Sequence, residues 1–384
     1  MSKLNDRHLA GLYIHIPFCK QKCNYCDFHF SVSLKNKAEL IEALKKELIL
    51  RKDEVQESVE TIYFGGGTPS IFMYDELAGI FEVIQANYSI NPKAEITLEA
   101  NPDDLSLKYL KEIKNLNFNR LSIGVQSFFD ADLQFMNRAH TAKEAVFAIE
   151  NAKELGFQNL TIDLIYGVPN MSLDRWKQNL ELFSSLDIPH LSSYALTVEA
   201  KTVLAYAIKK KKIKPLDDEL AKIHFEFLVD FMKEHSYIQY ELSNFAKKGS
   251  ESKHNTSYWQ GKKYLGFGPS AHSFNTTSRS WNVANNSKYI KSLRAGELPS
   301  EIEELSKSMQ YNEYIMTGLR TIWGVDTNKI KIDFGDQYLS YFNSRNKKYL
   351  EKQILYLIDE NRVGVHPKKF FLVDGIIADL FCVD

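Results

Sequence analysis

Three cysteines lie close together near the N-terminus, at Cys19, Cys23 and Cys26. Their C-x3-C-x2-C spacing directly follows a short apolar segment, 12–16, which we expect to form a strand. Thiolates are the usual protein ligands of iron-sulfur clusters, and one short loop can wrap a cluster when its sulfurs converge. Three thiolates hold three irons of a [4Fe-4S] cluster and leave the fourth without a protein ligand. The spacing therefore predicts a cluster whose open iron does the chemistry.

Zinc is the alternative metal for this loop. Zinc sites usually close with N or S ligands, often as two separated pairs, and no second cysteine pair follows here. His15 or His29 could complete a zinc site, so the loop by itself leaves this interpretation open. The remaining cysteine, Cys382, stands alone near the C-terminus, and we interpret it as a small apolar residue.

The composition bounds the class of protein. A chain of 384 residues that is 44% hydrophobic and 25% charged fits one large domain and one small domain. Lys and Arg number 48 against 49 for Asp and Glu, so the net charge of -1 gives no electrostatic case for nucleic acid. Binding of a small or apolar ligand fits better.

Cysteine usage and hydropathy indicate the compartment. Four cysteines, three of them clustered, do not make a disulfide framework, and clustered thiolates need a reducing compartment such as the cytoplasm. Residues 1–11 have no apolar signal-peptide core, and Asp374 and Asp379 interrupt the apolar stretch near the C-terminus. We therefore expect neither a signal peptide nor a transmembrane helix, and peripheral membrane contact stays open.

Short apolar runs alternate with segments of helical periodicity over the first half of the chain. Strands are expected at 12–16, 61–64, 95–99, 120–125, 160–166 and 191–196, and helices at 38–47, 74–86, 105–116, 142–155 and 173–186. This order predicts about six parallel βα units that curl into a full or partial TIM barrel. A doubly wound open sheet is the competing architecture.

Polar and glycine residues follow five successive strands, where ligands of such folds gather. Glycines 65–67 let a ligand approach the backbone, Glu99 could pair with an ammonium group or ribose hydroxyls, Asp163 could bond hydroxyls, and Arg138 could hold a carboxylate. Taken one at a time, each of these residues can be explained by an ordinary structural role, such as a tight turn or an ion pair. Beside an open-iron cluster, the combination suggests S-adenosylmethionine, whose amine and carboxylate would chelate the free iron before reductive cleavage to a 5'-deoxyadenosyl radical.

The second half of the chain divides into two parts. Residues 244–286 are rich in Gly, Ser and Asn without clear periodicity, so we expect a functional loop region. Helices are expected at 305–321, 336–343 and 350–361, followed by strand-like pieces at 362–365 and 370–373. This pattern suggests a winged-helix-like interaction or lid module. The predicted division is 1–240 for the barrel, 241–300 for the loop-rich extension and 301–384 for the C-terminal domain.

Taken together, the cysteine loop and the Gly-Gly-Gly-Thr-Pro, Gly-Val-Gln-Ser and Asp-Leu-Ile-Tyr-Gly-Val-Pro runs resemble the radical SAM superfamily, in its oxygen-independent coproporphyrinogen III oxidase branch. The resemblance covers essentially the whole chain and implies a partial TIM barrel with a smaller C-terminal domain. It implies that Cys19, Cys23 and Cys26 ligate the cluster. The S-adenosylmethionine contacts that it implies are Tyr13, Gly66, Gly67, Thr68, Glu99, Gln126, Arg138 and Asp163, with Tyr25 and Ala195 as further candidates.

Two kinds of protein make up that branch. The decarboxylases carry another cysteine two residues after the third, where this chain has Phe28. The chain looks like the HemW-type heme chaperones, which share its Cys-Asp-Phe run and an H-N-x-x-Y-W motif, here at 254–259. The resemblance implies His254 as a heme ligand with Tyr258 and Trp259 as flat neighbours, and His272 is a second candidate. From the residues alone, His254 reads as an exposed histidine in a polar loop.

The expected function is a cytoplasmic heme chaperone that binds a [4Fe-4S] cluster, S-adenosylmethionine and heme, and delivers heme to respiratory or other hemoproteins. Membrane contact and a homodimer are the further partners considered, and no nucleic acid is expected. The alternative is oxidative decarboxylation of coproporphyrinogen III to protoporphyrinogen IX. A zinc-stabilised interaction protein is the third interpretation.

Overall fold

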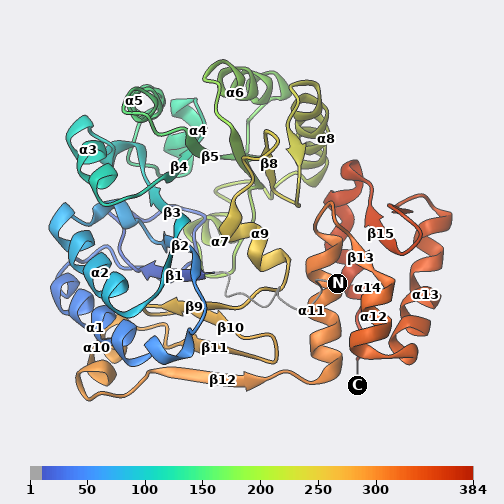
Figure 1. Ribbon diagram of the computed structural model, residues 1–384. Helices are drawn as coiled ribbons and strands as arrows, with labels where there is room; N and C mark the ends of the chain where they lie inside the picture. The colour runs from blue at the N-terminus through green and yellow to red at the C-terminus, as the bar shows by residue number, and fades with distance from the viewer. Residues whose placement is uncertain (1–10, 384) are drawn as a thin grey trace.

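A curved sheet of parallel strands forms the centre of the computed structural model, which describes residues 11–383 (Figure 1). The parallel strands are β1 (Gly11–Ile16), β2 (Val59–Gly66), β3 (Ile90–Ala100), β4 (Arg120–Gln126), β5 (Asn159–Tyr166) and β6 (His190–Ala195). They pair in chain order, each parallel to the next. The α/β class and the six predicted strands are confirmed.

Helices cover the outer side of the curve (Figure 1). They are α1 (Lys37–Leu50), α2 (Tyr74–Asn87), α3 (Leu107–Asn115), α4 (Asp130–Phe135), α5 (Ala142–Glu154) and α6 (Leu173–Ser185). Side chains alternate along each strand. In β1, Leu12, Ile14 and Ile16 are fully buried in the core, while Tyr13 and His15 lie on the inner side with other polar side chains. The inner side of the sheet can therefore hold polar chemistry.

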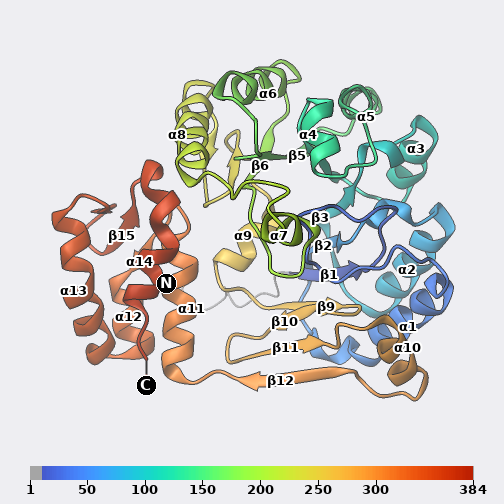
Figure 2. The same ribbon diagram turned by 180° about the vertical axis from the view of Figure 1, so that it is seen from behind.

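The sheet continues beyond both ends of the parallel part (Figure 2). Strand β9 (Tyr264–Phe267) runs parallel to β1, and β10 (His272–Phe274), β11 (Ser278–Asn282) and β12 (Ser300–Glu304) follow in antiparallel order. At the other edge, β8 (Asn244–Ala246) and β7 (Ile238–Gln239) extend β6. Over the described residues the order runs from β12 to β7 without joining its ends, which makes a partial barrel.

Residues 244–286 are more regular than the sequence predicted. They hold β8 to β11, helix α9 (Lys253–Trp259) and the start of α10 (Asn286–Arg294). The four strands are only three to five residues long, too short to show a period, and pairing with an existing sheet edge stabilises them. Helix α9 lies on the inner side of the curve (Figure 1).

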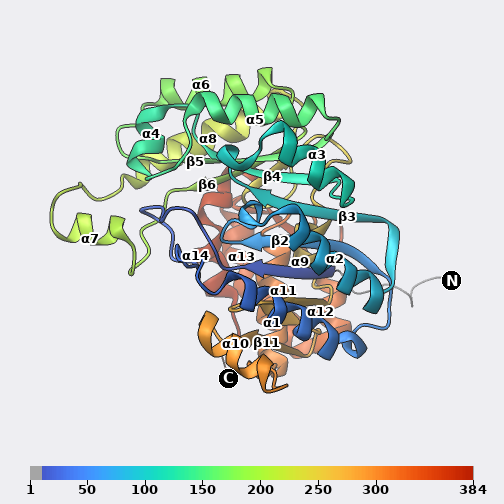
Figure 3. The ribbon, with the colours of Figure 1, turned by 90° about the vertical axis from the view of Figure 1, so that its left-hand side faces the viewer.

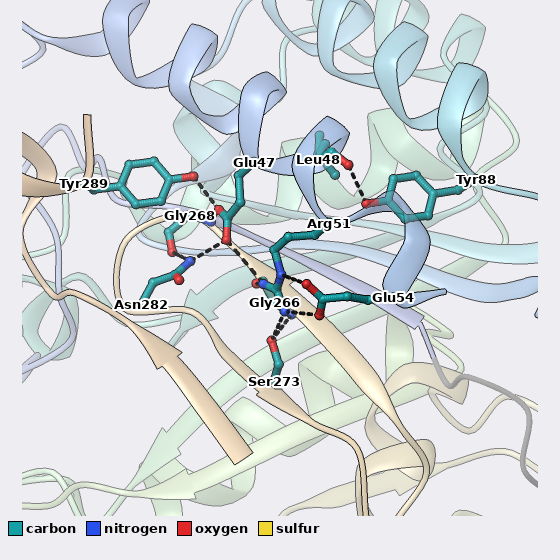
Figure 4. Close-up of polar contacts among 10 residues, drawn as sticks. All are labelled: Glu47, Leu48, Arg51, Glu54, Tyr88, Gly266, Gly268, Ser273, Asn282 and Tyr289. Atoms are coloured by element: carbon teal, nitrogen blue, oxygen red, sulfur yellow. Dashed lines mark hydrogen bonds and ion pairs between the residues drawn. The ribbon is translucent and has the colours of Figure 1, made fainter. Parts of the chain in front are cut away.

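Polar contacts fasten this extension to α1 (Figure 4). The Glu47 carboxylate is fully buried and accepts hydrogen bonds from the Tyr289 hydroxyl at 2.5 Å, the Asn282 amide at 2.7 Å and the Gly268 backbone N–H at 2.8 Å. Arg51, one turn further along α1, donates to Glu47 at 3.3 Å and to the Gly266 carbonyl at 2.8 Å. One carboxylate thus joins α1 to three parts of the extension.

The C-terminal part combines helices with a small sheet, as expected of a winged-helix-like module. Its elements are α11 (Lys307–Leu319), β13 (Val325–Asp326), α12 (Thr327–Phe334), α13 (Asp336–Glu351), β14 (Leu355–Leu357), β15 (Arg362–Val365) and α14 (Val373–Leu380). The helix predicted at 350–361 is wrong, because the chain leaves α13 through Gln353, whose φ of 53° ends the helix, and forms β14. The strand predicted at 370–373 is also wrong, since Pro367 starts a 3-10 helix there.

Helix α7 (Val203–Lys209) and its flanking segments project from the body ahead of α8 (Asp218–Glu234) (Figure 3). The Leu204 N–H donates to the Asn24 carbonyl at 2.9 Å, which places α7 beside the cysteine loop. Within 11–383, no helix combines the length and apolar character that a membrane span requires.

Candidate functional site

The three cysteines lie on the loop between β1 and α1, and each is half-buried. The loop closes on itself, because the Cys19 N–H donates to the Ser31 carbonyl at 3.1 Å and the Ser31 N–H donates to the Pro17 carbonyl at 2.9 Å. Burial raises the pKa of the Cys19 thiol to about 11. A bound metal would reverse this effect, since a coordinated thiol is deprotonated outright.

The turn between α4 and α5 holds the far side of the cysteine loop. The Asn24 N–H donates to the Met136 carbonyl at 3.1 Å, and its side-chain amide donates to the Phe135 carbonyl at 2.8 Å. In return, the Asn137 side chain donates to the Lys22 carbonyl at 2.7 Å. Asn137 has a φ of 56°, a conformation that asparagine adopts more readily than most residues. These contacts hold the loop through asparagine side chains and backbone groups, and none of them uses a cysteine thiol.

Arg138 links this turn directly to a cysteine. One guanidinium nitrogen donates to the Cys23 sulfur at 3.3 Å, and the other donates to the Asn101 side chain at 2.7 Å and the Gly124 carbonyl at 2.8 Å. Its Nε is buried without a partner among the described residues. Arg138 can therefore stabilise negative charge on the thiolate and still has a donor to offer.

The glycine triplet packs against the start of the same loop. The Gly67 N–H donates to the Ile16 carbonyl at 2.9 Å, the Thr68 N–H donates to the Phe18 carbonyl at 2.7 Å, and the Thr68 hydroxyl hydrogen-bonds to the Cys19 thiol. A Cβ on Gly67 would lie only 2.6 Å from the Phe18 carbonyl oxygen, so the close approach requires glycine. The cysteines and the triplet predicted from separate parts of the sequence therefore meet.

Glu99 lies at the end of β3 and is fixed by two donors. The Tyr63 hydroxyl donates to it at 2.7 Å and the Gly66 N–H at 3.1 Å. Burial raises its pKa, and burial together with the charge of Glu99 raises the pKa of Asp163 to about 7. Two carboxyl groups that share the inner side of the sheet cannot both ionise freely.

The other predicted site residues differ in how directly they contact this group of side chains. The Gln126 amide folds back to within contact of Gly124, beside Arg138, because Gln126 ends β4 with a φ of 69°. Burial is the main cause of the raised pKa of Tyr25, and the charges of Arg138 and Asp163 also act on it. The Tyr13 hydroxyl lies 3.1 Å from His15 Nδ1. Ala195 ends β6 half-buried, with no side-chain group to bond.

Sequence reasoning missed the residues that hold this set in place. Tyr63 positions Glu99, and Asn101 positions Arg138. Tyr63 lies two residues before Gly65 in β2, so the alternation of side chains along the strand places both on the inner side. That alternation was the signal that could have identified it.

His254 occupies a different position from the one expected. Its side chain is only 1% exposed, Nδ1 lies 2.7 Å from the Thr61 hydroxyl, and Nε2 lies 2.6 Å from the Tyr258 hydroxyl. Its backbone N–H donates to Glu95 at 3.1 Å. The exposed position expected from the residues alone is wrong, and an iron could reach a ring nitrogen of His254 only after one of these bonds broke. His254 and Tyr258 instead anchor α9 inside the barrel, and the neighbouring Trp259 is half-buried.

The burial of His254 predicts how stability depends on pH. Burial lowers its pKa to about 3 in the folded chain, from 6.5. Between these values the unfolded chain binds a proton that the folded chain does not, so the free energy of unfolding falls as pH falls. For His254→Gln we expect the slope between pH 6 and pH 4 to be shallower than wild type by up to about 1.4 kcal/mol per pH unit. Urea unfolding at several pH values measures both slopes, and parallel slopes would contradict the assigned burial.

Over residues 11–383, no three His, Cys, Asp or Glu side chains surround one point as the ligands of a single metal ion would. A four-iron cluster gives each thiolate its own iron, so its ligands need not meet at one point. A hollow of about 850 Å³ lies at the opposite end of the sheet, near Ile90, Asn119 and Asn159, where strands begin. None of the predicted site residues lines it.

Comparisons with known proteins define the class. A family model of the radical SAM superfamily matches residues 13–183, which include most of β1, the cysteine loop and the strands β2 to β5. The solved coproporphyrinogen III oxidase HemN from Escherichia coli, described as a radical SAM enzyme, superposes with a TM-score of 0.84 over 99% of this chain and 91% of that chain. At 22% identity this likeness shows the fold alone. Residues 13–183 therefore match a radical SAM domain.

Curated relatives narrow the class to one family. The heme chaperone HemW of Bacillus subtilis is 35% identical over 91% of this chain and 93% of its own length. The heme chaperone HemW of Lactococcus lactis is 33% identical over 97% of both chains. The chain therefore belongs to the HemW family.

Membership of the radical SAM superfamily implies a [4Fe-4S] cluster and S-adenosylmethionine. The residues present fit both groups. Three thiols share one anchored loop, a guanidinium lies against one of them with a donor to spare, and the Gly66 N–H fixes the Glu99 carboxylate beside the glycine triplet.

Proposed function

We propose that this protein is a heme chaperone, which binds a [4Fe-4S] cluster, S-adenosylmethionine and heme and passes heme to hemoproteins such as respiratory enzymes. The observation that carries the proposal is the 35% identity, over nearly the whole chain, to a relative named heme chaperone HemW. Phe28 supports it, because it stands where the decarboxylases of this branch have a further cysteine, and its side chain is 68% exposed.

In this proposal Cys19, Cys23 and Cys26 hold the cluster, and S-adenosylmethionine lies between the cysteine loop and the ends of β2 to β6. A cluster held by these cysteines would supply one-electron reduction of the sulfonium. Arg138 then offers its unpaired Nε to a carboxylate, and Glu99, fixed by Tyr63 and the Gly66 N–H, accepts from an amine or ribose hydroxyl. Asp163, with a pKa of about 7, can donate or accept a hydrogen bond near neutral pH.

Delivery of heme to membrane-bound recipients requires contact near a membrane surface. Helix α7 supports such contact, since Val203 and Tyr206 are exposed beside the lysines at 209–212. Lysines next to exposed apolar groups favour an anionic lipid surface. Co-sedimentation with vesicles that contain phosphatidylglycerol measures this contact, and equal recovery with neutral vesicles would contradict it.

Heme titration tests the proposed function. The purified, cluster-reconstituted protein is expected to give a saturable Soret band at one heme per chain, because relatives over nearly the full length carry the name heme chaperone. Incubation with reductant, S-adenosylmethionine and coproporphyrinogen III is expected to give no protoporphyrinogen IX. Absence of saturable heme binding would overturn the proposal. Appearance of the decarboxylated product would overturn it in favour of the oxidase.

A further inference from the structure

The inner side of the β9 to β11 extension carries a row of aromatic side chains. In the sheet register His272 lies opposite Trp281, and Phe274 lies opposite Tyr264. Ser273, between the two, points to the outer side, where its hydroxyl accepts from Arg51 at 3.2 Å. Because successive side chains alternate, the rings of His272 and Phe274 lie on the inner side. Tyr264 confirms this side, since its ring lies 4.4 Å from that of Tyr258 on α9.

Several of these rings are accessible. His272 is exposed, and Trp281, Phe274 and Tyr264 are half-buried. The His272 ring lies 6.2 Å from that of Trp281, tilted by 32°. Half-buried rings side by side offer the flat apolar surface that a porphyrin can cover.

His272 differs from His15, His29, His190 and His254 on the inner side in that neither of its ring nitrogens is paired. Both nitrogens of His254 and of His15 are paired, and His29 Nε2 lies 2.7 Å from the Asn286 side chain. Across residues 11–383, no hydrogen bond involves the ring of His272. Partial burial, helped by the charge of Arg279, lowers its pKa, which favours the neutral form in which imidazole donates to iron.

His272 also lies close to the cluster side of the sheet. The two rings are near enough that a proton on His272 would lower the pKa of His15, and a Cβ on Gly66 would lie 2.5 Å from the His15 ring. His29, three residues after Cys26, stacks on His15 at 6.4 Å. The surface around His272 is therefore the inner-side surface next to the cysteine loop and the glycine triplet.

We propose that His272 ligates the heme iron, with the porphyrin lying along Trp281 on the inner side of the β9 to β11 extension. This inference rests on the proposed heme binding and names its ligand. It assigns His254 a structural role, as the anchor of α9. Heme and S-adenosylmethionine would then occupy neighbouring parts of the same inner side.

Heme titration of matched variants tests the assignment. His272→Ala is expected to weaken heme binding by about tenfold or more and to shift the Soret band, because the axial ligand is lost. Added imidazole is expected to restore the band position. The control is His366→Ala, which removes another imidazole that stacks on an aromatic ring, that of Tyr356 at 4.5 Å, and is expected to bind like wild type. Trp281→Leu is expected to weaken binding while keeping the wild-type band position.

The outcomes separate the ligand from the function. If wild type binds heme and His272→Ala gives the same band and affinity, the assignment is overturned while heme binding stands. Loss of the band in a folded His254→Ala variant, with His272→Ala unchanged, would overturn it in favour of the H-N-x-x-Y-W motif. If wild type itself binds no heme, both the proposed function and the ligand fall. Circular dichroism of each variant shows that the fold is kept.

Discussion

Cys23→Ser is expected to abolish the iron-sulfur cluster. The serine hydroxyl is a poor ligand for iron, and two remaining thiolates cannot hold three corners of a cubane. Cys23 is the cysteine whose sulfur accepts from Arg138, so its loss also removes the charge-assisted contact to the cluster. After anaerobic reconstitution we expect the broad visible absorption to disappear, and iron and sulfide to fall to background.

Cys382→Ser is the matched control for this variant. Cys382 is half-buried near the C-terminus, where its backbone N–H donates to Asn312 at 2.8 Å, and its thiol is not part of the cysteine loop. We expect it to reconstitute like wild type. Wild-type iron in Cys23→Ser would show that the loop does not bind the cluster, and zinc without iron in wild type would leave only the interaction-protein interpretation.

The parallel part of the fold could be predicted from the sequence because each unit is locally complete. Strands such as β1 and β5 are short apolar runs, and helices such as α3 and α5 begin at residues that cap them. Ser106 accepts from the Tyr109 N–H and Thr141 from the Glu144 N–H, and both signals can be seen in the sequence. The direction of the strands then follows from the alternation of strand and helix.

The extension could not be predicted because its elements exist only through pairing with distant residues. Strand β9 is four residues long and is stabilised by β1, about 250 positions earlier. The same holds for His254, whose polar neighbours suggested an exposed loop. Its actual partners, Thr61 and Glu95, come from β2 and β3, and no local pattern indicates that they will bury it.

The candidate site, too, could be predicted from the sequence only in part. The rule that ligands gather beyond strand ends identified Glu99, Arg138 and the glycine triplet, and the structure brings them to the cysteine loop. Tyr63, which orients Glu99, was missed because a tyrosine within a strand is usually interpreted as packing, and Asn101 was given no role although it follows the same strand as Glu99. Residues that carry chemistry can be recognised in a sequence by their type. Residues that position them can be recognised only by their contacts in the folded chain.

Glu47→Ala is expected to destabilise the protein by about 3–5 kcal/mol, the cost of removing one partner of a buried ion pair. Figure 4 shows why the effect should be large. The carboxylate accepts from Tyr289, Asn282 and Gly268 and pairs with Arg51, so its removal leaves three buried donors without their acceptor and Arg51 with Glu54 as its remaining carboxylate. Urea unfolding followed by circular dichroism measures the change in free energy.

Glu54→Ala is the matched control, because it removes a carboxylate that pairs with the same Arg51 at 2.9 Å but is 44% exposed. Comparing the two variants shows how much of the effect comes from burial of the carboxylate. Exposed pairs are worth about 0–1 kcal/mol, so this variant should unfold nearly like wild type. Because Glu47 joins α1 to the extension, Glu47→Ala should also increase hydrogen exchange in β9 to β11 before it does so in β3 to β5. Equal effects of the two substitutions would mean that the extension is held by its apolar contacts, and not by this carboxylate.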